Sequence, residues 1–243
     1  MGTGSFDTVE KVIVALRASS TDDDWVARLL GPVATGLLDL DLPGLTVNVR
    51  DAPVRDSLMT LTTLRPPVQA VISIWTQQHY GEKVAEALRM LAPESESLAA
   101  YLVTESAPLP PPSSLPGQRL AGLANIALLR RPVDLDEATW RHRWLHEHTG
   151  VAIATQSTFG YLQNYVVRAL TPDAPEVAAI VEELFPIEAV ESLRAFFGAA
   201  DDADLQHRLG QMVESTSRFG ANVNIDTVPT GRYVLRNPFA IGF

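Results

Sequence analysis

The sequence contains no cysteine. Disulfides, thiolate metal sites and a cysteine nucleophile are therefore excluded, and the composition fits a reducing compartment, so we expect a cytoplasmic protein. No apolar run approaches the roughly 20 residues of a membrane-spanning helix, so we expect no membrane partner. The N-terminal stretch MGTGSFDTVEK lacks the basic and then apolar layout of a signal peptide.

Basic residues are scarce, with 19 Lys and Arg against 29 Asp and Glu, and the formal charge is −10. A chain this acidic repels a phosphate backbone, so we expect no nucleic-acid partner. The sequence also lacks glycine-rich phosphate loops of the GxGxxG or GxxxxGK type and a GxSxG nucleophile elbow. Histidine, tyrosine, asparagine and arginine remain, and these side chains suit proton transfer without a bound cofactor.

Apolar residues make up 46% of the 243 positions, enough to form the core of one large domain or of two small ones. Near the middle, residues 107–117 read APLPPPSSLPG. Five prolines in eleven residues exclude a helix or a central strand and favour extended polyproline II. The sequence therefore predicts an N-terminal module over 1–106, a proline-rich linker over 107–118 and a C-terminal module over 119–243.

The hydrophobic patterns on the two sides of this linker follow a similar order. The first half predicts strands over 9–17, 44–51, 68–77 and 97–106, with helices over 21–40 and 81–91. The second half predicts strands over 120–131, 158–170 and 231–236, an extended stretch over 222–228, and helices over 134–155, 176–185, 187–198 and 202–217. Each half approximates the split βαβ plan of a ferredoxin-like module, so the predicted class is α+β. Because an open apolar sheet face must be buried, we expect the two sheets to pack face to face around a cavity that holds a ligand.

One stretch, WRHRWLHEHTGVA over 140–152, holds three of the five histidines and two of the four tryptophans. At about 100° per helical residue, Trp140, Trp144 and His148 share one stripe, which the tryptophans mark as buried. A histidine on such a stripe is either a satisfied core residue or a partly buried titratable group of a functional site. His142 and His146 have the i, i+4 spacing of two helical metal ligands, but the HExxH arrangement is missing, so we expect no metal site.

This stretch and the following FGYLQNYVVRAL resemble the EthD-like proteins of the dimeric α/β-barrel superfamily. In that family an aromatic-rich helix ends in a His-Gly-Pro-Leu-Ala-like sequence, and a strand with an aromatic–x–x–Asn core follows. His148 matches the family histidine, although Thr149 stands before the glycine and no proline follows, and Tyr161 and Asn164 match the strand motif. LGPVA in the first half looks like the same motif with Leu30 in place of the histidine, so the chain resembles two such modules in tandem.

The resemblance implies a fold in which two ferredoxin-like units pack sheet to sheet as a barrel, here within one chain. Members of the superfamily include decarboxylases, dehydratases, isomerases and cyclases of aromatic or polyketide-like compounds, haem-using enzymes, and proteins without known activity. Fold alone does not choose among these. Because apolar barrel exteriors often pair further, a homodimer of tandem chains is a possible assembly.

The candidate catalytic residues are His148, as general acid–base, and Tyr161, as hydrogen-bond donor to an enolate oxygen. Alternation along the strand favours Tyr161 and Tyr165 facing the cavity, with the leucine and valines of the other face beneath a helix. Candidate binding residues are Trp144, Tyr165, Trp75 and Asn125. For Tyr165 the alternative is core packing, and for Asn125 it is a structural bridge.

These residues favour a cofactor-independent lyase or isomerase that acts on a small hydrophobic compound through His148. A non-catalytic small-molecule binding protein with the same cavity is one alternative. A haem protein with His148 as axial ligand is another.

Overall fold

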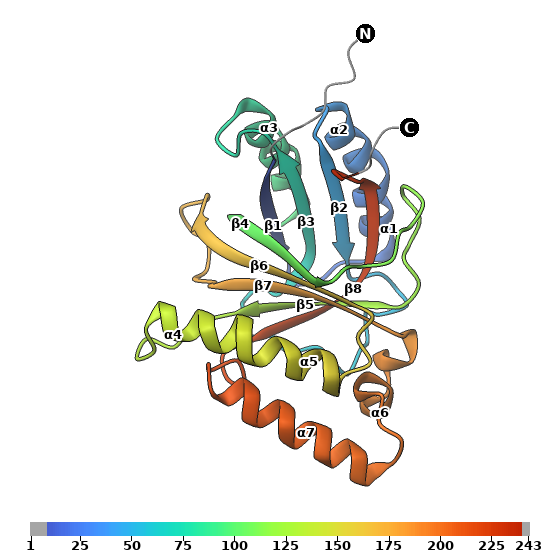
Figure 1. Cartoon of the computed structure of the whole chain (residues 1–243). Helices are drawn as coiled ribbons and strands as arrows, with labels where there is room; N and C mark the ends of the chain where they lie inside the picture. Colours follow the sequence, from blue (N-terminus) through green and yellow to red (C-terminus); the bar gives the residue numbers. More distant parts are fainter. Residues whose placement is uncertain (1–8, 240–243) are drawn as a thin grey trace.

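The computed structural model describes residues 9–239, which form eight strands with helices on two sides (Figure 1). The N-terminal half contains β1 (Glu10–Arg17), α1 (Asp23–Arg28), the π-helical turn η1 (Leu29–Val33), α2 (Ala34–Asp39), β2 (Gly44–Val49), β3 (Val68–Thr76), α3 (Glu82–Leu91), the 3₁₀ turn η2 (Ala92–Glu94) and β4 (Ser97–Leu109). The C-terminal half contains β5 (Leu123–Leu129), α4 (Glu137–His142), the π-helical turn η3 (Arg143–His148), α5 (Thr149–Thr155), β6 (Gly160–Ala169), β7 (Ala179–Phe185), the 3₁₀ turn η4 (Ile187–Val190), α6 (Leu193–Phe197), α7 (Asp202–Ser217) and β8 (Asp226–Arg236).

The strands form one closed barrel in the order β1-β3-β2-β8-β5-β7-β6-β4, and all neighbours are antiparallel. Each half contributes four adjacent strands, in the orders β4-β1-β3-β2 and β8-β5-β7-β6. In both halves the fourth strand lies beside the first, followed by the third and the second. This is the strand order of a split βαβ module. The β2–β8 and β4–β6 pairs join the halves. The predicted fold class is confirmed: α+β, with two ferredoxin-like modules forming a barrel within one chain.

The segment 176–185 is the main error in the predicted elements, because most of it is strand β7 and not a helix. Alanine, leucine and glutamate favour a helix, but β7 pairs with β5 on one side and β6 on the other. Every residue of β7 is buried, and such central strands lose the simple alternation that marks a half-exposed strand. The stretches over 222–228 and 231–236 merge into the single strand β8.

The proline-rich segment 107–118 begins within β4, which continues to Leu109, and then passes outside the strands toward β5. It joins the two sets of four strands, and the division into modules at this segment remains our interpretation. Pro32 does not end the first long helix but lies within η1, between α1 and α2. A π-helical turn accommodates the proline because the regular i→i−4 pattern is already interrupted there.

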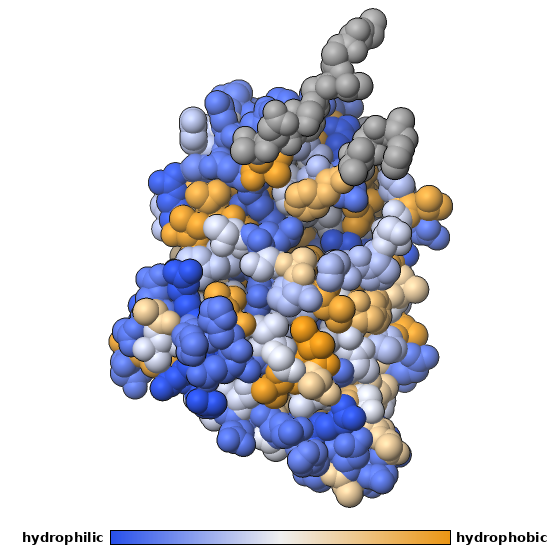
Figure 2. All heavy atoms as spheres, in the orientation of Figure 1, coloured by the Kyte–Doolittle hydropathy of each residue, from blue (hydrophilic) through white to orange (hydrophobic). Residues whose placement is uncertain are grey.

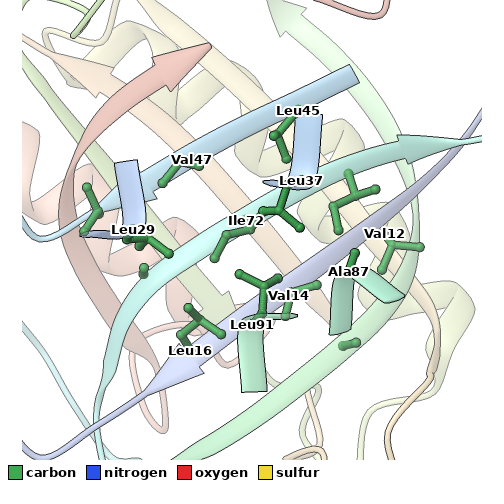
Figure 3. Packing of buried hydrophobic residues seen from close by; sticks show 14 of the residues in the cluster. Val12, Val14, Leu16, Leu29, Leu37, Leu45, Val47, Ile72, Ala87 and Leu91 are labelled. Carbon is green, nitrogen blue, oxygen red and sulfur yellow. The ribbon is translucent and has the colours of Figure 1, made fainter. Parts of the chain in front are cut away.

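The centre of the outer face of the N-terminal sheet is apolar. Figure 3 shows Val12, Val14 and Leu16 of β1 beside Ile72 of β3, with the helical residues Leu37 and Leu91 packed on them. All six are fully buried. Apolar burial of this kind is the main stabilising contribution to a fold, so this layer anchors the barrel.

On the surface, hydrophobic residues lie in separate groups among hydrophilic ones, over the face that Figure 2 shows. Within residues 9–239, no helix combines the length and the apolar character that a membrane crossing requires.

Candidate functional site

The side chains of β6 face the opposite way from our prediction. Tyr161 packs in the helix-facing core with Trp140 and Trp144, and Gln163 Nε2 donates to Thr149 Oγ1 at 2.7 Å. Leu162, Asn164 and Val166 take the other face, toward the inside of the barrel. The error has a physical cause: helices bury one face of β6 and the barrel buries the other, so apolar alternation does not distinguish them.

We had expected His148 to project into the space between the two sheets, and this prediction is wrong. It lines a cavity of about 190 Å³ between the outer face of the C-terminal sheet and its covering helices. Trp144, Tyr161 and Asn125 line the same cavity. The rest of the wall comes from Met59, Ala127, Leu129, Gln156, Val181, Glu183, Phe196, Phe197, Met212, Thr216, Phe219, Ala221, Ile225 and Thr227.

Two predicted binding residues lie elsewhere. The Tyr165 hydroxyl donates to the Glu137 carboxylate near the start of α4, away from this cavity. Trp75 lies on the inner face of the barrel, with Lys11 Nζ 4.6 Å from its ring centroid. The structure therefore brings together four of the six candidate residues and separates Tyr165 and Trp75 from them.

The π-helical turn η3 carries two of the cavity residues, Trp144 near its start and His148 at its end. Imidazole Nδ1 lies 2.9 Å from Ser215 Oγ on α7, and the ring centroid lies 4.9 Å from that of Phe219. Gly220, with φ +81°, makes the turn that follows Phe219, and a Cβ there would lie 2.3 Å from Pro132 Cγ. Burial lowers the pKa of His148 to about 4, so the imidazole is neutral at pH 7.

A polar row crosses the helix-facing side of the C-terminal sheet. Glu183 of β7 pairs directly with Asn125 of β5 and with Tyr161 of β6, so the three side chains share one face. Glu183 is 8% exposed, and burial raises the pKa of its carboxyl to about 8. Burial and the nearby Glu183 also raise the pKa of the Tyr161 phenol well above its usual value. The carboxyl and the phenol are therefore mainly protonated at pH 7.

Sequence analysis missed Glu183 because it fell within the segment predicted as a helix. Had the run AAIVEELF been read with period two, this glutamate would have shared a face with Val181 and Phe185. A carboxyl on an otherwise apolar strand face is the signal that could have found it.

Some polar groups around the cavity have hydrogen-bond partners within the protein, and others have none. With its amide oriented to suit its neighbours, Gln156 donates to Glu183 Oε1 at 3.0 Å and to the Ala152 carbonyl at 3.2 Å. Among residues 9–239, Asn125 Oδ1 and Trp144 Nε1 have no hydrogen-bond partner, although both atoms are buried. Asn125 is therefore not the structural bridge that the sequence allowed. Unpaired buried polar groups are costly, and a ligand could satisfy them.

The other two histidines of the long helix, His142 and His146, are exposed, and their ring centroids lie 5.2 Å apart. His142 Nε2 lies 3.4 Å from a carboxylate oxygen of Glu147. Over the described range 9–239, no group of three or more histidine or carboxylate side chains is placed to hold a metal ion.

The residues around His148 do not fit a haem. The cavity of about 190 Å³ is smaller than even the lower end of ordinary ligand pockets, about 300 Å³. Phe219 lies against the imidazole, and the lining contains no arginine or lysine to pair with the propionates.

Comparisons with known proteins show the fold. No protein-family model matches the chain, and no curated protein matches its sequence. Among solved structures, an anthrone oxidase-like protein has a TM-score of 0.57 at 10% identity, covering 98% of each chain. A dye-decolorizing peroxidase from Bacteroides thetaiotaomicron has a TM-score of 0.51 at 10% identity, covering 95% of this chain and 94% of its own. At such identities the likeness defines the architecture alone, that of the dimeric α+β-barrel proteins, and does not confirm the EthD-like family.

Proposed function

We propose that this protein is a cofactor-independent enzyme of the lyase or isomerase type that transfers protons on a small, ring-sized compound, as an EthD-like protein. The observation that carries the proposal is that Glu183 and His148 line one cavity and that burial shifts their pKa values in opposite directions. Environments that push the pKa values of two titratable groups apart are typical of acid–base sites.

The three ionisable groups suit different roles. Glu183, with a pKa of about 8, lies near neutral pH, where a general acid or base works best. The neutral His148 imidazole, held at Nδ1 by Ser215, accepts a proton from a carbon next to a carbonyl group. Tyr161 stays protonated and donates a hydrogen bond to the resulting enolate oxygen. Return of the proton to another atom completes an isomerisation, and loss of a leaving group completes an elimination.

The size and the polar atoms of the cavity restrict the ligand. A cavity of about 150 Å³ holds a benzene molecule, so the 190 Å³ observed here suits one ring with small substituents. The Trp144 N–H needs an acceptor and Asn125 Oδ1 needs a donor. The proposed substrate is therefore a compact, largely apolar ring compound that carries both a carbonyl-type acceptor and a hydrogen-bond donor.

A non-catalytic binding protein is the second candidate function. It is favoured by the pKa of about 4 at His148, which makes the imidazole a weak base. Such a protein would bind the same compounds without converting them.

Exchange of carbon-bound hydrogen tests the choice between these functions. The probe is 4-hydroxycyclohexanone, a single ring with a ketone acceptor, a hydroxyl donor and exchangeable C–H groups next to the carbonyl, in D₂O, and NMR follows the incorporation of deuterium. We expect the protein to accelerate the exchange, and both Glu183→Gln and His148→Gln to reduce the acceleration about 100-fold, as the loss of a general acid–base group does. His146→Gln is the matched control on the exposed face of the same helical segment and should leave the rate unchanged.

If 4-hydroxycyclohexanone binds but exchanges no faster than in buffer, the catalytic proposal is wrong and the binding function replaces it. Unchanged exchange in Glu183→Gln would remove that residue from the mechanism. Failure of 4-hydroxycyclohexanone to bind at all would contradict the proposed ligand class.

A further inference from the structure

A second hollow, of about 310 Å³, opens at the end of the barrel where β1 begins and β8 ends. Its inner wall comes from strands of both modules, through Thr46, Trp75, Leu162 and Arg232. Its outer wall includes the proline-rich segment, with Pro110, Pro111, Pro112, Ser113, Ser114 and Pro116. The linker predicted from the sequence thus also borders a cavity. Polyproline stretches are stiff, so this wall is preformed.

Arg232 and Glu105 are the charged residues that line this hollow, and Arg232 is 8% exposed. Its Nε donates to Glu182 Oε1 at 2.9 Å, and Asn48 Nδ2 donates to the same oxygen at 2.7 Å. The two terminal nitrogens of the guanidinium make no hydrogen bond to any other residue of the described range. Glu182 therefore binds the Arg232 guanidinium through Nε. The two terminal nitrogens, the planar fork of the guanidinium, remain available to another partner.

Two hydroxyl groups on facing walls are also unsatisfied. Thr46 is 2% exposed, and its Oγ1 has no hydrogen-bond partner within residues 9–239. The same holds for Ser114 Oγ in the proline-rich segment. A buried hydroxyl without a partner costs free energy, which a bound polar group would recover.

The remaining charges near the hollow neutralise each other. Lys11 of β1 forms an ion pair with Glu105 of β4, and its ammonium lies against the Trp75 ring. Glu182 is paired with Arg232 and Asn48. Both nearby carboxylates thus have partners, and the guanidinium fork is the group left to attract a ligand.

We propose that this hollow binds a small organic carboxylate with an apolar body. The carboxylate accepts a two-point hydrogen bond from the Arg232 fork and further hydrogen bonds from Thr46 and Ser114. The apolar body packs against Trp75, Leu162 and the prolines. Arginine matches a carboxylate in geometry as well as charge, which distinguishes this ligand from a neutral one of the same shape. The site is separate from the His148 cavity and does not depend on the function proposed for it.

Binding of 4-phenylbutyrate and of its neutral amide, 4-phenylbutyramide, tests the proposal by isothermal titration calorimetry. The two probes have the same shape and differ in charge. Because hydrogen bonds between two charged groups are stronger than those to a neutral amide, we expect the acid to bind at least about tenfold more tightly than the amide. Arg232→Lys keeps a cation beside Glu182 but removes the fork, and it should abolish most of this preference.

Thr46→Val provides a milder variant of similar shape, which keeps the test decisive if Arg232→Lys does not fold. It should weaken binding of the acid about fivefold. Asn125→Leu, in the other cavity, is the control and should leave both affinities unchanged. Equal affinity for acid and amide, absence of binding, or sensitivity to Asn125→Leu and not to Thr46→Val would each overturn the proposal.

Discussion

The two modules share a strand order and differ in what they place between sheet and helices. In the N-terminal module, the outward residues Val12, Ile72 and Leu45 belong to one apolar layer. In the C-terminal module, the matching layer contains the polar row and the cavity beside His148. Both modules interrupt their first long helix with a π-helical turn, η1 or η3, and only the second turn carries a histidine. The same strand order and helix arrangement therefore encloses an apolar layer in one module and a polar cavity in the other.

This difference shows how a tandem fold can separate stability from chemistry. In the N-terminal half, packed apolar side chains fill the layer between sheet and helices, whereas the matching layer of the C-terminal half keeps a desolvated carboxyl and two unpaired polar atoms. Groups that lower stability persist where function requires them. The barrel joins the two sheets, so the packed half supports the half that holds the cavity.

The largest expected effect comes from placing a carboxyl in the packed half. Ile72 is fully buried on β3, at the centre of the layer in Figure 3. Ile72→Glu should lower the free energy of unfolding by about 4 kcal/mol, because no partner compensates the buried charge. Ile72→Val, the control, should cost about 1 kcal/mol. Urea unfolding measures both. Similar losses in the two variants would show that the layers tolerate polar groups equally.

A smaller expected effect is the pH dependence of stability that two buried groups of the C-terminal module produce. The Glu183 pKa rises from 4.5 to about 8 on folding, so the folded state binds the extra proton and stability falls as pH rises between these values. The His148 pKa falls from 6.5 to about 4, so stability rises with pH over that lower window. Of these two groups, Glu183 alone still titrates between pH 6.5 and 8, and its contribution should lower stability by about 2 kcal/mol.

Glu183→Gln should therefore flatten the stability profile between pH 6.5 and 8, as measured by urea unfolding at several pH values. His148→Gln is the matched variant, and it should flatten the rise between pH 4 and 6.5 and leave the upper window unchanged. A wild-type profile without a decline above pH 6.5 would contradict a carboxyl that stays protonated in the folded protein.

Sequence patterns were sufficient for most of the fold. Apolar, β-branched runs predict β1 and β3, and the helix predicted from residue 21 begins close to the observed start of α1, where Asp22 accepts from the Trp25 amide. The repeated order of elements then predicted the tandem modules. Only pairing with β5 and β6 makes β7 a strand, and pairing between segments far apart is not visible in local propensity.

The candidate site was predictable in part. The tryptophan stripe identified His148 as buried, and the resemblance directed attention to Tyr161. Which side of β6 faces the helices depends on how the barrel closes, so the location of the cavity could not be derived from the alternation. Glu183 was missed together with the strand that carries it. Trp75 lies on the inner side of the barrel wall and His148 on the outer side. The pattern of residues along the sequence does not show on which side of the wall each residue lies.

The smallest expected effect concerns Asn125, an unpaired amide on the helix-facing side of β5, whereas Val12, Val14 and Leu16 occupy the helix-facing side of β1. Asn125→Leu removes the unpaired amide from the C-terminal layer and should raise the free energy of unfolding by about 1 kcal/mol. The same change should weaken binding of phenol about fivefold, because the phenol hydroxyl loses an acceptor. Toluene is the matched probe without a donor, and its affinity should not fall. NMR titration of both probes gives the comparison. If phenol and toluene weaken by the same factor, lost space explains the change, and the amide has no role in selecting a ligand.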